Sequence, residues 1–314
     1  MKAFVFDHPR YLSTLTWLGT PVDLPCGSAL LRPAMAGLQD ARGSWPYQSL
    51  PSADLLTALA EESPALNLTA VIRPDAGEEA LQATTGQLEA PFALTVRTLK
   101  DHLCHSAALP PARDSYSART HRRLKEARNR FTVQRETFGP AHLVIADWQE
   151  RIRQRRGVPH VSSPDFAHFA ALADIAPALG PSLACITLRQ KQGGALAAIF
   201  LAMQDGRTGS WHAHSALSDE AAISEYCNYL LFDGAIDVLK GQDIWFGGAP
   251  GGPNGDGVFR FKQRFANHSA PARILSVDLD PARLDRLRAM TGRHDFLPDY
   301  RDPGTELAPR PDAA

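Results

Sequence analysis

Three apolar segments separated by short turns constrain the fold more strongly than any other feature of this sequence. They occupy residues 183–190, 195–204 and 210–217, and the connecting sequences KQGG and DGRTG are rich in glycine. Connections this short join antiparallel strands, because a parallel pair needs a crossover of a dozen or more residues. The sequence therefore predicts a three-stranded antiparallel meander.

Helical patterns flank the meander. Two helices are expected before it, at 145–156 and 163–179, the second with Pro164 in its first turn. One longer helix is expected after it, at 223–241, followed by a short strand at 243–248 and a short helix. This order predicts an α/β domain built on a mostly antiparallel sheet flanked by helices.

Residues 1–112 have a different character, with many prolines and short apolar runs. The segments 66–74 and 92–99 resemble strands bounded by turn residues, and 52–62 resembles a helix capped by Ser52. The prolines at 110 and 111 then interrupt the chain. We therefore expect two domains, 1–112 and 113–290, followed by a C-terminal tail at 291–314, whose last dozen residues are expected to be disordered.

The composition excludes several classes of protein. The formal net charge of the 314 residues is −1, so any binding of phosphate must come from a local patch. The four cysteines form no CxxC pair and no Cys/His spacing typical of a metal site, so we expect reduced thiols and no metal. No apolar run approaches the roughly 20 residues that span a bilayer, and the N-terminus lacks a signal-peptide core. We expect a cytoplasmic protein without a membrane span.

Residues 113–135 form a local basic segment. They contain eight bases and two acids, a net charge of +6, and Thr120, Leu124, Ala127 and Phe131 recur at helical spacing. The pattern predicts a helix with one thin apolar stripe and a surface rich in guanidinium groups. Such a surface is either simply solvated or neutralises phosphate groups of a ligand.

A second unusual segment is GVFRFKQRFA, residues 257–266. Its aromatic residues alternate with bases, and a segment with six glycines, FGGAPGGPNGDG, leads into it. As a helix, it places Val258, Phe261 and Phe265 on one face, which leaves Lys262 directed to one side. Phe259 falls outside that face. The glycines permit either a flexible surface loop or a close approach of the backbone to a ligand.

Three segments together resemble the FemAB-like branch of the GNAT acyltransferase superfamily, which includes aminoacyl-tRNA-dependent peptidyl transferases. They are DIWFGGAPGGPNGDGVFRFKQRFA, WHAHSALSDEAAISEYCNYLLFDGAIDVLKG and SYSARTHRRLKEARNR. The similarity covers most of the chain, is densest from 113 to 270, and is most specific in the FRFK segment. Ala266 departs from the pattern, which has glycine there, and Trp45-Pro46-Tyr47 replaces a glycine-tyrosine turn.

The resemblance implies tandem GNAT-like domains, the first degenerate and on the side of the acceptor. It implies an N-acyltransferase that moves an aminoacyl group from aminoacyl-tRNA to an amine, with Phe261 and Lys262 orienting the aminoacyl end of the donor. Acyl transfer needs stabilisation of charge on a tetrahedral intermediate, and a lysine behind a strand end can supply it. If the donor is a tRNA, an exposed Phe259 could stack a base. We assign donor binding to Arg119, Arg122, Arg123, Arg260, Arg264, Gly247 and Gly248, and acceptor binding to Trp45, Tyr47 and His212.

The sequence offers several candidates for the general base. His212 and His214 alternate in one expected strand, so both should face one side of the sheet, where His214 is a candidate base and a structural role is the alternative. Asp256 and Glu225 are further candidates. No cofactor is expected beyond the donor itself, aminoacyl-tRNA or acyl-CoA.

Two alternative functions remain open at this point. The first is the same fold using acyl-CoA to acylate a small-molecule amine. Relatives that use acetyl-CoA bind its pyrophosphate at a glycine-rich turn, whereas this chain has LSDEAAIS there, with two acids and no glycine. The second is a non-catalytic module that binds RNA or nucleotides. The sequence does not identify the acceptor or the transferred group.

Overall fold

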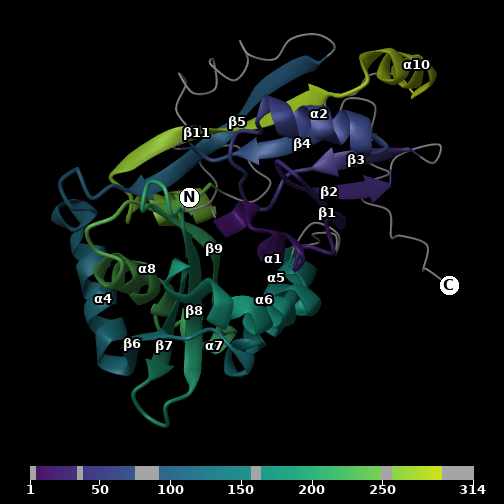
Figure 1. Ribbon diagram of the computed structural model, residues 1–314. Coiled ribbons are helices and arrows are strands. Elements are labelled where there is room, and N and C mark those ends of the chain that lie inside the picture. Colours follow the sequence, from purple (N-terminus) through teal and green to yellow (C-terminus); the bar gives the residue numbers. More distant parts are fainter. Residues whose placement is uncertain (1–4, 34–37, 75–91, 157–163, 249–256, 292–314) are drawn as a thin grey trace. The chain divides into compact units, whose positions relative to one another are not determined.

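A computed structural model describes residues 5–33, 38–74, 92–156, 164–248 and 257–291 of the protein (Figure 1). The chain forms two compact units. Unit 1 comprises Lys100–Gln154 and Asp165–Pro271, together with Met1–Val5, and unit 2 comprises Phe6–Leu99, Arg155–Pro164 and Ala272–Ala314. The expected ranges were 1–112 and 113–290; in the structure residues 100–112 belong to unit 1, and the described residues 272–291 belong to unit 2.

Unit 1 contains a mixed sheet in which the predicted meander is confirmed. The meander consists of β7 (Leu183–Gln190), β8 (Leu196–Gln204) and β9 (Trp211–Ser218), paired antiparallel in sequence order. The sheet order in this unit is β5-β10-β9-β8-β7-β6, with β5 (Ala93–His105), β6 (Phe131–Glu136) and β10 (Ile244–Gly247) as the other strands. Only the first residues of β10 pair with β9, in parallel.

Helices cover this sheet (Figure 1). Unit 1 contains α4 (Ala118–Arg130), most of α5 (Val144–Arg156), α6 (Phe166–Leu179), α7 (Glu220–Ile223), α8 (Cys227–Val238) and α9 (Gly257–Gln263). Helix α8 packs on β6 to β9, and α4 packs beside α8. The core between them includes Ile186 of β7, Phe200 of β8 and Phe232 of α8. The apolar stripe expected on the basic helix is confirmed, since Thr120, Leu124 and Ala127 are buried.

Two helix boundaries differ from the sequence-based expectation. Asp165 caps α6 by accepting a hydrogen bond from the backbone N–H of His168 at 2.9 Å, so Pro164 precedes the cap instead of lying in the first turn. The helix expected over 223–241 starts later than predicted, because α7 ends at Ile223, Tyr226 adopts a left-handed conformation with φ of 61°, and α8 begins at Cys227. Helix α8 ends at Val238, before Gly241.

Unit 2 contains strands in the order β1-β2-β3-β4-β11. Their bounds are Thr20–Leu24, Gly27–Pro33, Gln39–Arg42, Ala65–Ile72 and His268–Asp278, the last beginning within unit 1. The helices are α1 (Pro9–Leu12), α2 (Ala53–Glu62) and α10 (Pro281–Thr291). The cap predicted at Ser52 is confirmed, since its Oγ accepts a hydrogen bond from Leu55 N at 3.1 Å. Of the tail expected at 291–314, all but Thr291 lies outside the described residues.

Candidate functional site

Strands β9 and β10 diverge shortly after they begin. Their pairing joins Trp211 to Ile244 and His212 to Trp245, and β9 then continues to Ser218 without β10. The register between β10 and β5 shifts at Trp245 and Gly247. Gly247 has φ of 72°, a conformation that side chains disfavour, so a glycine allows the chain to turn away here.

Lys262 lies at this turn, as predicted. Its Nζ donates hydrogen bonds of 2.7 Å to the carbonyl oxygens of Phe246 and Gly248. Phe246 lies in β10 and Gly248 directly follows that strand, so a short helix and a strand end together fix the position of one ammonium group. Gly248 therefore contacts Lys262 through its carbonyl oxygen, and the assignment of Gly247 and Gly248 to donor binding stays a prediction.

Aromatic packing holds α9 in place. The ring of Phe261 makes edge contacts with Tyr229 and Phe232 of α8, at centroid distances of 5.2 and 5.3 Å. Phe265 is fully buried in the same core. The prediction that Phe261 and Phe265 share a packed face is therefore confirmed, and this packing sets the direction of the intervening Lys262.

The prediction for Phe259 was wrong. The sequence analysis placed it outside the packed face of α9, whereas the structure buries it against Leu103 of β5 and Ala266. Helix α9 is only seven residues long and contacts protein on two sides, so Phe259 is not an exposed platform for a base. Arg260 and Arg264 are exposed, as their assignment to the donor requires.

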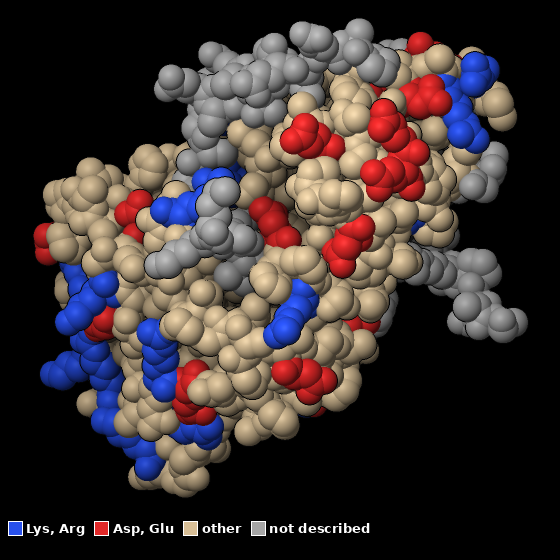
Figure 2. Space-filling model, in the orientation of Figure 1, with Lys and Arg blue, Asp and Glu red and all other residues tan. Residues whose placement is uncertain are grey.

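The basic helix α4 lies at the surface of unit 1, where Figure 2 shows Lys and Arg side chains gathered along one edge. Several of its cations are neutralised by acids. Arg128 and Arg130 form ion pairs with Asp233 and Glu225, and Arg122 lies 3.7 Å from Glu126. Among the described residues, Arg119 and Lys125 have no acidic partner, and both are exposed. The expected patch therefore exists, but its effective charge is smaller than +6.

Asp233 neutralises two arginines at once. This carboxylate of α8 is fully buried and accepts hydrogen bonds from Arg113 Nε at 2.7 Å and Arg128 NH2 at 2.6 Å. The Tyr116 hydroxyl lies 3.2 Å from Oδ1, and burial, followed by the charge of Asp233, raises the pKa of Tyr116. Arg113 and Arg128, two of the eight bases of segment 113–135, therefore hold this segment against α8.

Arg123, assigned to the donor from the sequence, has aromatic partners. Its guanidinium carbon lies 5.0 Å from the ring centroids of both Tyr226 and Tyr229, and NH1 donates a hydrogen bond to the Tyr229 hydroxyl. Arg123 is half-buried, in contrast to its neighbour Arg122, of which 70% is exposed. Neither tyrosine was predicted as a site residue. Their local sequence pattern does not indicate that Arg123, about a hundred positions earlier, packs against both rings.

His214 packs against α6. Its ring stacks on His168 with an interplanar angle of 7°, the two Nε2 atoms are 3.0 Å apart, and Nδ1 is 3.0 Å from the Ser215 hydroxyl. Burial, and then the charge of His168, lower the pKa of His214 well below 6.5. His214 is therefore neutral at pH 7, as a general base must be. Its ring contacts α6, however, whereas Phe261, another residue predicted to be catalytic, packs on α8.

The other predicted residues occupy several places. His212 is fully buried, with Nε2 3.1 Å from the Ser210 hydroxyl, so in this conformation it cannot touch an acceptor. Strand β9 has a bulge at His214, because Leu201 pairs with Ser215 and the next residue, Ala202, pairs with Ala213. This bulge interrupts the simple alternation expected for the two histidines. Glu225 is paired with Arg130. Asp256 lies outside the described residues.

Trp45 and Tyr47 belong to unit 2. Tyr47 is buried, and its ring lies 6.3 Å from that of Phe6. Trp45 is half-buried, its ring is 5.8 Å from Trp17, and its carbonyl accepts a hydrogen bond of 2.6 Å from the Tyr11 hydroxyl. The assignment of these residues to an acceptor stays a prediction.

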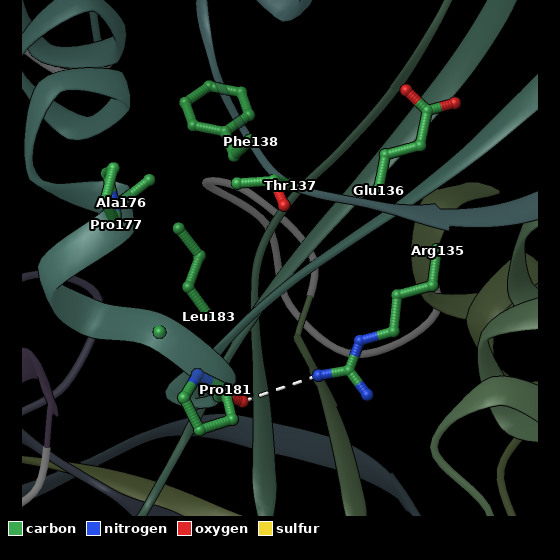
Figure 3. Close-up of a pocket in the computed structure, with 9 residues that line it drawn as sticks. Arg135, Glu136, Thr137, Phe138, Ala176, Pro177, Pro181 and Leu183 are labelled. Atoms are coloured by element: carbon green, nitrogen blue, oxygen red, sulfur yellow. Dashed lines mark hydrogen bonds between the residues drawn. The ribbon is translucent and has the colours of Figure 1, made fainter.

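Two pockets in unit 1 lie away from Lys262. One, of about 430 Å³, lies where β6, β7 and the end of α6 meet; Figure 3 shows Arg135 directed toward the Pro181 carbonyl, 3.4 Å from it. The second, of about 270 Å³, shares Arg135 and Pro181 and includes Trp211 and Leu239. Trp211 begins β9 and Leu239 follows α8, whereas Lys262 contacts the end of β10. Lys262 lines neither pocket.

The described residues include neither a membrane-spanning helix nor a cluster of metal ligands. No described helix is long and apolar enough to cross a membrane. Within the described ranges, no three His, Cys, Asp or Glu side chains come together in a way that could hold a metal ion.

No family model matches the sequence, and no curated protein is significantly similar to it. The fold, however, is similar to that of solved structures. One is FemX, with a TM-score of 0.63 at 12% identity, covering 90% of this chain and 94% of FemX. Another is a conserved protein of unknown function from Bacteroides thetaiotaomicron, with a TM-score of 0.55 at 11% identity, covering 88% and 94% of the two chains.

A third similar structure is the C-terminal domain of a candidate lysylphosphatidylglycerol synthetase from Agrobacterium fabrum. Its TM-score is 0.52 at 14% identity, over 91% of this chain and 93% of that one. At such low identities the similarity concerns the fold. The resemblance seen in the sequence is thus confirmed at the level of the fold, which this chain shares with FemX and with the synthetase domain.

Proposed function

We propose that this protein is an N-acyltransferase that moves an aminoacyl group from aminoacyl-tRNA onto an amine, forming an amide bond. The observation that carries the proposal is the fixed position of Lys262, whose Nζ lies 2.7 Å from two carbonyl oxygens where β9 and β10 diverge. Fold similarity to FemX over 90% of the chain supports the same reaction class. Fold alone does not define chemistry, so the site has to carry the argument.

The reaction needs a stabilised negative charge on oxygen. The neutral acceptor amine attacks the carbonyl carbon of the aminoacyl ester, and the C–N bond forms as the carbonyl π electrons move to oxygen. The C–O bond to the ribose then breaks; the amine nitrogen loses a proton and the leaving oxygen gains one. A preorganised ammonium near these oxygens lowers the barrier without reorganisation. Lys262 is the residue that we assign to this role.

The donor is assigned from the exposed cations of unit 1. Five exposed cations carry this assignment: Arg119, Arg122 and Lys125 on α4, Arg260 in α9, and Arg264 just after α9. Acidic partners occupy Arg128 and Arg130, so the remaining outward cations are the ones that could contact the phosphates of an acceptor stem. In this proposal, binding of the donor depends strongly on salt.

The acyl-CoA alternative has one observation in its favour. Helix α8 begins behind Tyr226, and among the described side chains none caps it with a hydrogen bond. Open backbone N–H groups at a helix N-terminus attract phosphate. Against this, the preceding segment contains Asp219, Glu220 and Glu225, although Arg130 neutralises the last.

A binding experiment separates the two donors. The purified protein is titrated with bulk aminoacyl-tRNA and, separately, with acetyl-CoA at low and moderate salt. We expect saturable tRNA binding whose logarithmic salt dependence becomes shallower by roughly 1 per removed phosphate contact in Arg119→Ala and Lys125→Ala. Lys240→Ala, an exposed cation beyond the end of α8, is the matched control and should leave the slope unchanged. Binding of acetyl-CoA without tRNA would overturn the assignment of the donor.

A further inference from the structure

We propose that Arg123 is a positioning residue, which acts through Tyr229 to hold Phe261, and thereby α9, at the transfer site. The inference rests on the proposed function for its catalytic consequence, although its structural part can be tested without it. It gives a cation of the basic helix a role in packing instead of contact with phosphates.

The first link joins Arg123 to two tyrosines. Its guanidinium carbon is 5.0 Å from each ring centroid, the rings of Tyr226 and Tyr229 are perpendicular to one another, and NH1 donates a hydrogen bond to the Tyr229 hydroxyl. Cation–π contacts of this kind are attractive, and more so where water is excluded. Arg123 is half-buried and Tyr229 is 8% exposed, so these contacts are partly shielded from water.

The second link joins Tyr229 to α9. The Tyr229 ring meets the ring of Phe261 at 87° and 5.2 Å, and Phe232 meets Phe261 from the next turn of α8 at 90° and 5.3 Å. Phe261 is thus held between two edge contacts, and it directly precedes Lys262. A displacement of Tyr229 therefore moves the residue that sets the direction of the ammonium.

The backbone at Tyr226 supports the same conclusion. A bulky residue in the left-handed region is an outlier that persists only when its surroundings hold it. Here φ is 61°, and the side chain that lies over the Tyr226 ring is Arg123. This turn ends α7 and starts α8, and so determines where Tyr229 falls.

Arg122 provides a matched comparison. It is the neighbour of Arg123 on α4, yet 70% of its side chain is exposed and its ion-pair partner is Glu126 at 3.7 Å. A double replacement of Arg122 and Arg123 would mix a surface cation with a packed one. Single conservative replacements by lysine keep the charge and remove the planar guanidinium, which alone can stack and bond in this geometry.

The test uses the full chain with 4-fluorophenylalanine at position 261, observed by ¹⁹F NMR. We expect Arg123→Lys and Tyr229→Phe to shift or broaden the resonance, because the first removes the stacking and the second removes the hydroxyl that accepts the bond. Arg122→Lys should leave it unchanged. An unchanged resonance in both Arg123→Lys and Tyr229→Phe would overturn the proposal. Thermal unfolding identifies any variant that fails to fold. If one of Arg123→Lys and Tyr229→Phe does not fold, the resonance of the other variant tests the proposal.

Kinetics supply a second readout, which structural damage alone would not give. We expect kcat for amide formation to fall roughly 10- to 100-fold in Arg123→Lys with KM for the donor within about twofold, because small misplacements cost rate. Lys240→Ala, which removes an exposed cation outside the proposed donor track, should leave both near wild type. A rise in KM with unchanged kcat would show that Arg123 contacts the donor instead. If the resonance moves while wild-type protein forms no amide, the proposed function fails and the positioning link stands.

Discussion

Arg113 Nε lies 2.7 Å from Oδ1 of Asp233, a carboxylate that is completely buried within α8. Asp233 also accepts from Arg128 of α4 at 2.6 Å, so one carboxylate joins the segment before α4, the helix α4 itself and α8. These are the elements that place Tyr229 and Phe232 beside Phe261. The stability of the unit and the geometry of the site therefore share a residue.

Replacement of Asp233 by alanine should destabilise the protein by roughly 2–4 kcal/mol, because two guanidinium groups lose their shared acceptor. The partly exposed arginines reduce the cost relative to a wholly buried pair. Asp237→Ala is the matched control; it also pairs with Arg113, at 2.5 Å, but is 56% exposed, so we expect less than about 1 kcal/mol. Urea denaturation of both variants measures the difference, and equal losses would contradict this account.

Stability should decrease as the pH falls below about 6.5, the ordinary value for histidine. Burial and His168 lower the pKa of His214 well below 6.5 in the folded protein, so the unfolded chain binds this proton first. The free energy of unfolding then decreases by up to about 1.4 kcal/mol per pH unit on this account. His105, whose pKa is also lowered, chiefly by burial, contributes in the same direction.

The variant His214→Gln tests this dependence. Its amide can bond the neighbouring Ser215 and His168, the polar groups that contact His214, but does not titrate. Chemical denaturation at pH 7.5, 6.5 and 5.5 should show a shallower decline than in wild type. A decline of equal steepness would show that His214 is not the source.

One thiol should react in the folded protein. Cys26 is exposed, whereas Cys104, Cys185 and Cys227 are buried. Burial, as the largest cause, raises the pKa of Cys185 to about 12 and of Cys227 to about 11, so neither forms thiolate at pH 8. A disulfide reagent should titrate one thiol quickly in native protein and four after unfolding. Cys26→Ser should remove the fast phase, and a fast phase of two or more thiols would contradict the burial.

Much of unit 1 could be predicted because its signals are local. Strands β7 to β9 are joined by short turns, and α4 shows its apolar stripe within 13 residues. Strand β11 was not predicted; it pairs with β4 between Asp278 and Asn67, about 200 positions apart. Short-range periodicity contains no information on such a partner.

The same limit applies to the site. Lys262 and Phe261 were assigned to the site from a family resemblance; the structure packs Phe261 against Tyr229 and fixes Lys262 on the carbonyls of Phe246 and Gly248. The ion pairs of α4 could not be predicted, since the acids that neutralise Arg128 and Arg130 come from positions 233 and 225. The break at Tyr226 depends on the packing of Arg123, and the burial of Phe259 depends on Leu103.

The most direct test of the central claim is amide formation by wild type and Lys262→Ala. The protein is incubated with tRNA charged with a pool of labelled amino acids and with candidate amines, and label that resists mild base, which cleaves the ester, is counted. We predict base-stable product with wild type and a loss of at least about 10²-fold in Lys262→Ala, with tRNA binding retained. Full activity in Lys262→Ala, or base-stable product from acetyl-CoA but from no charged tRNA, would contradict the account.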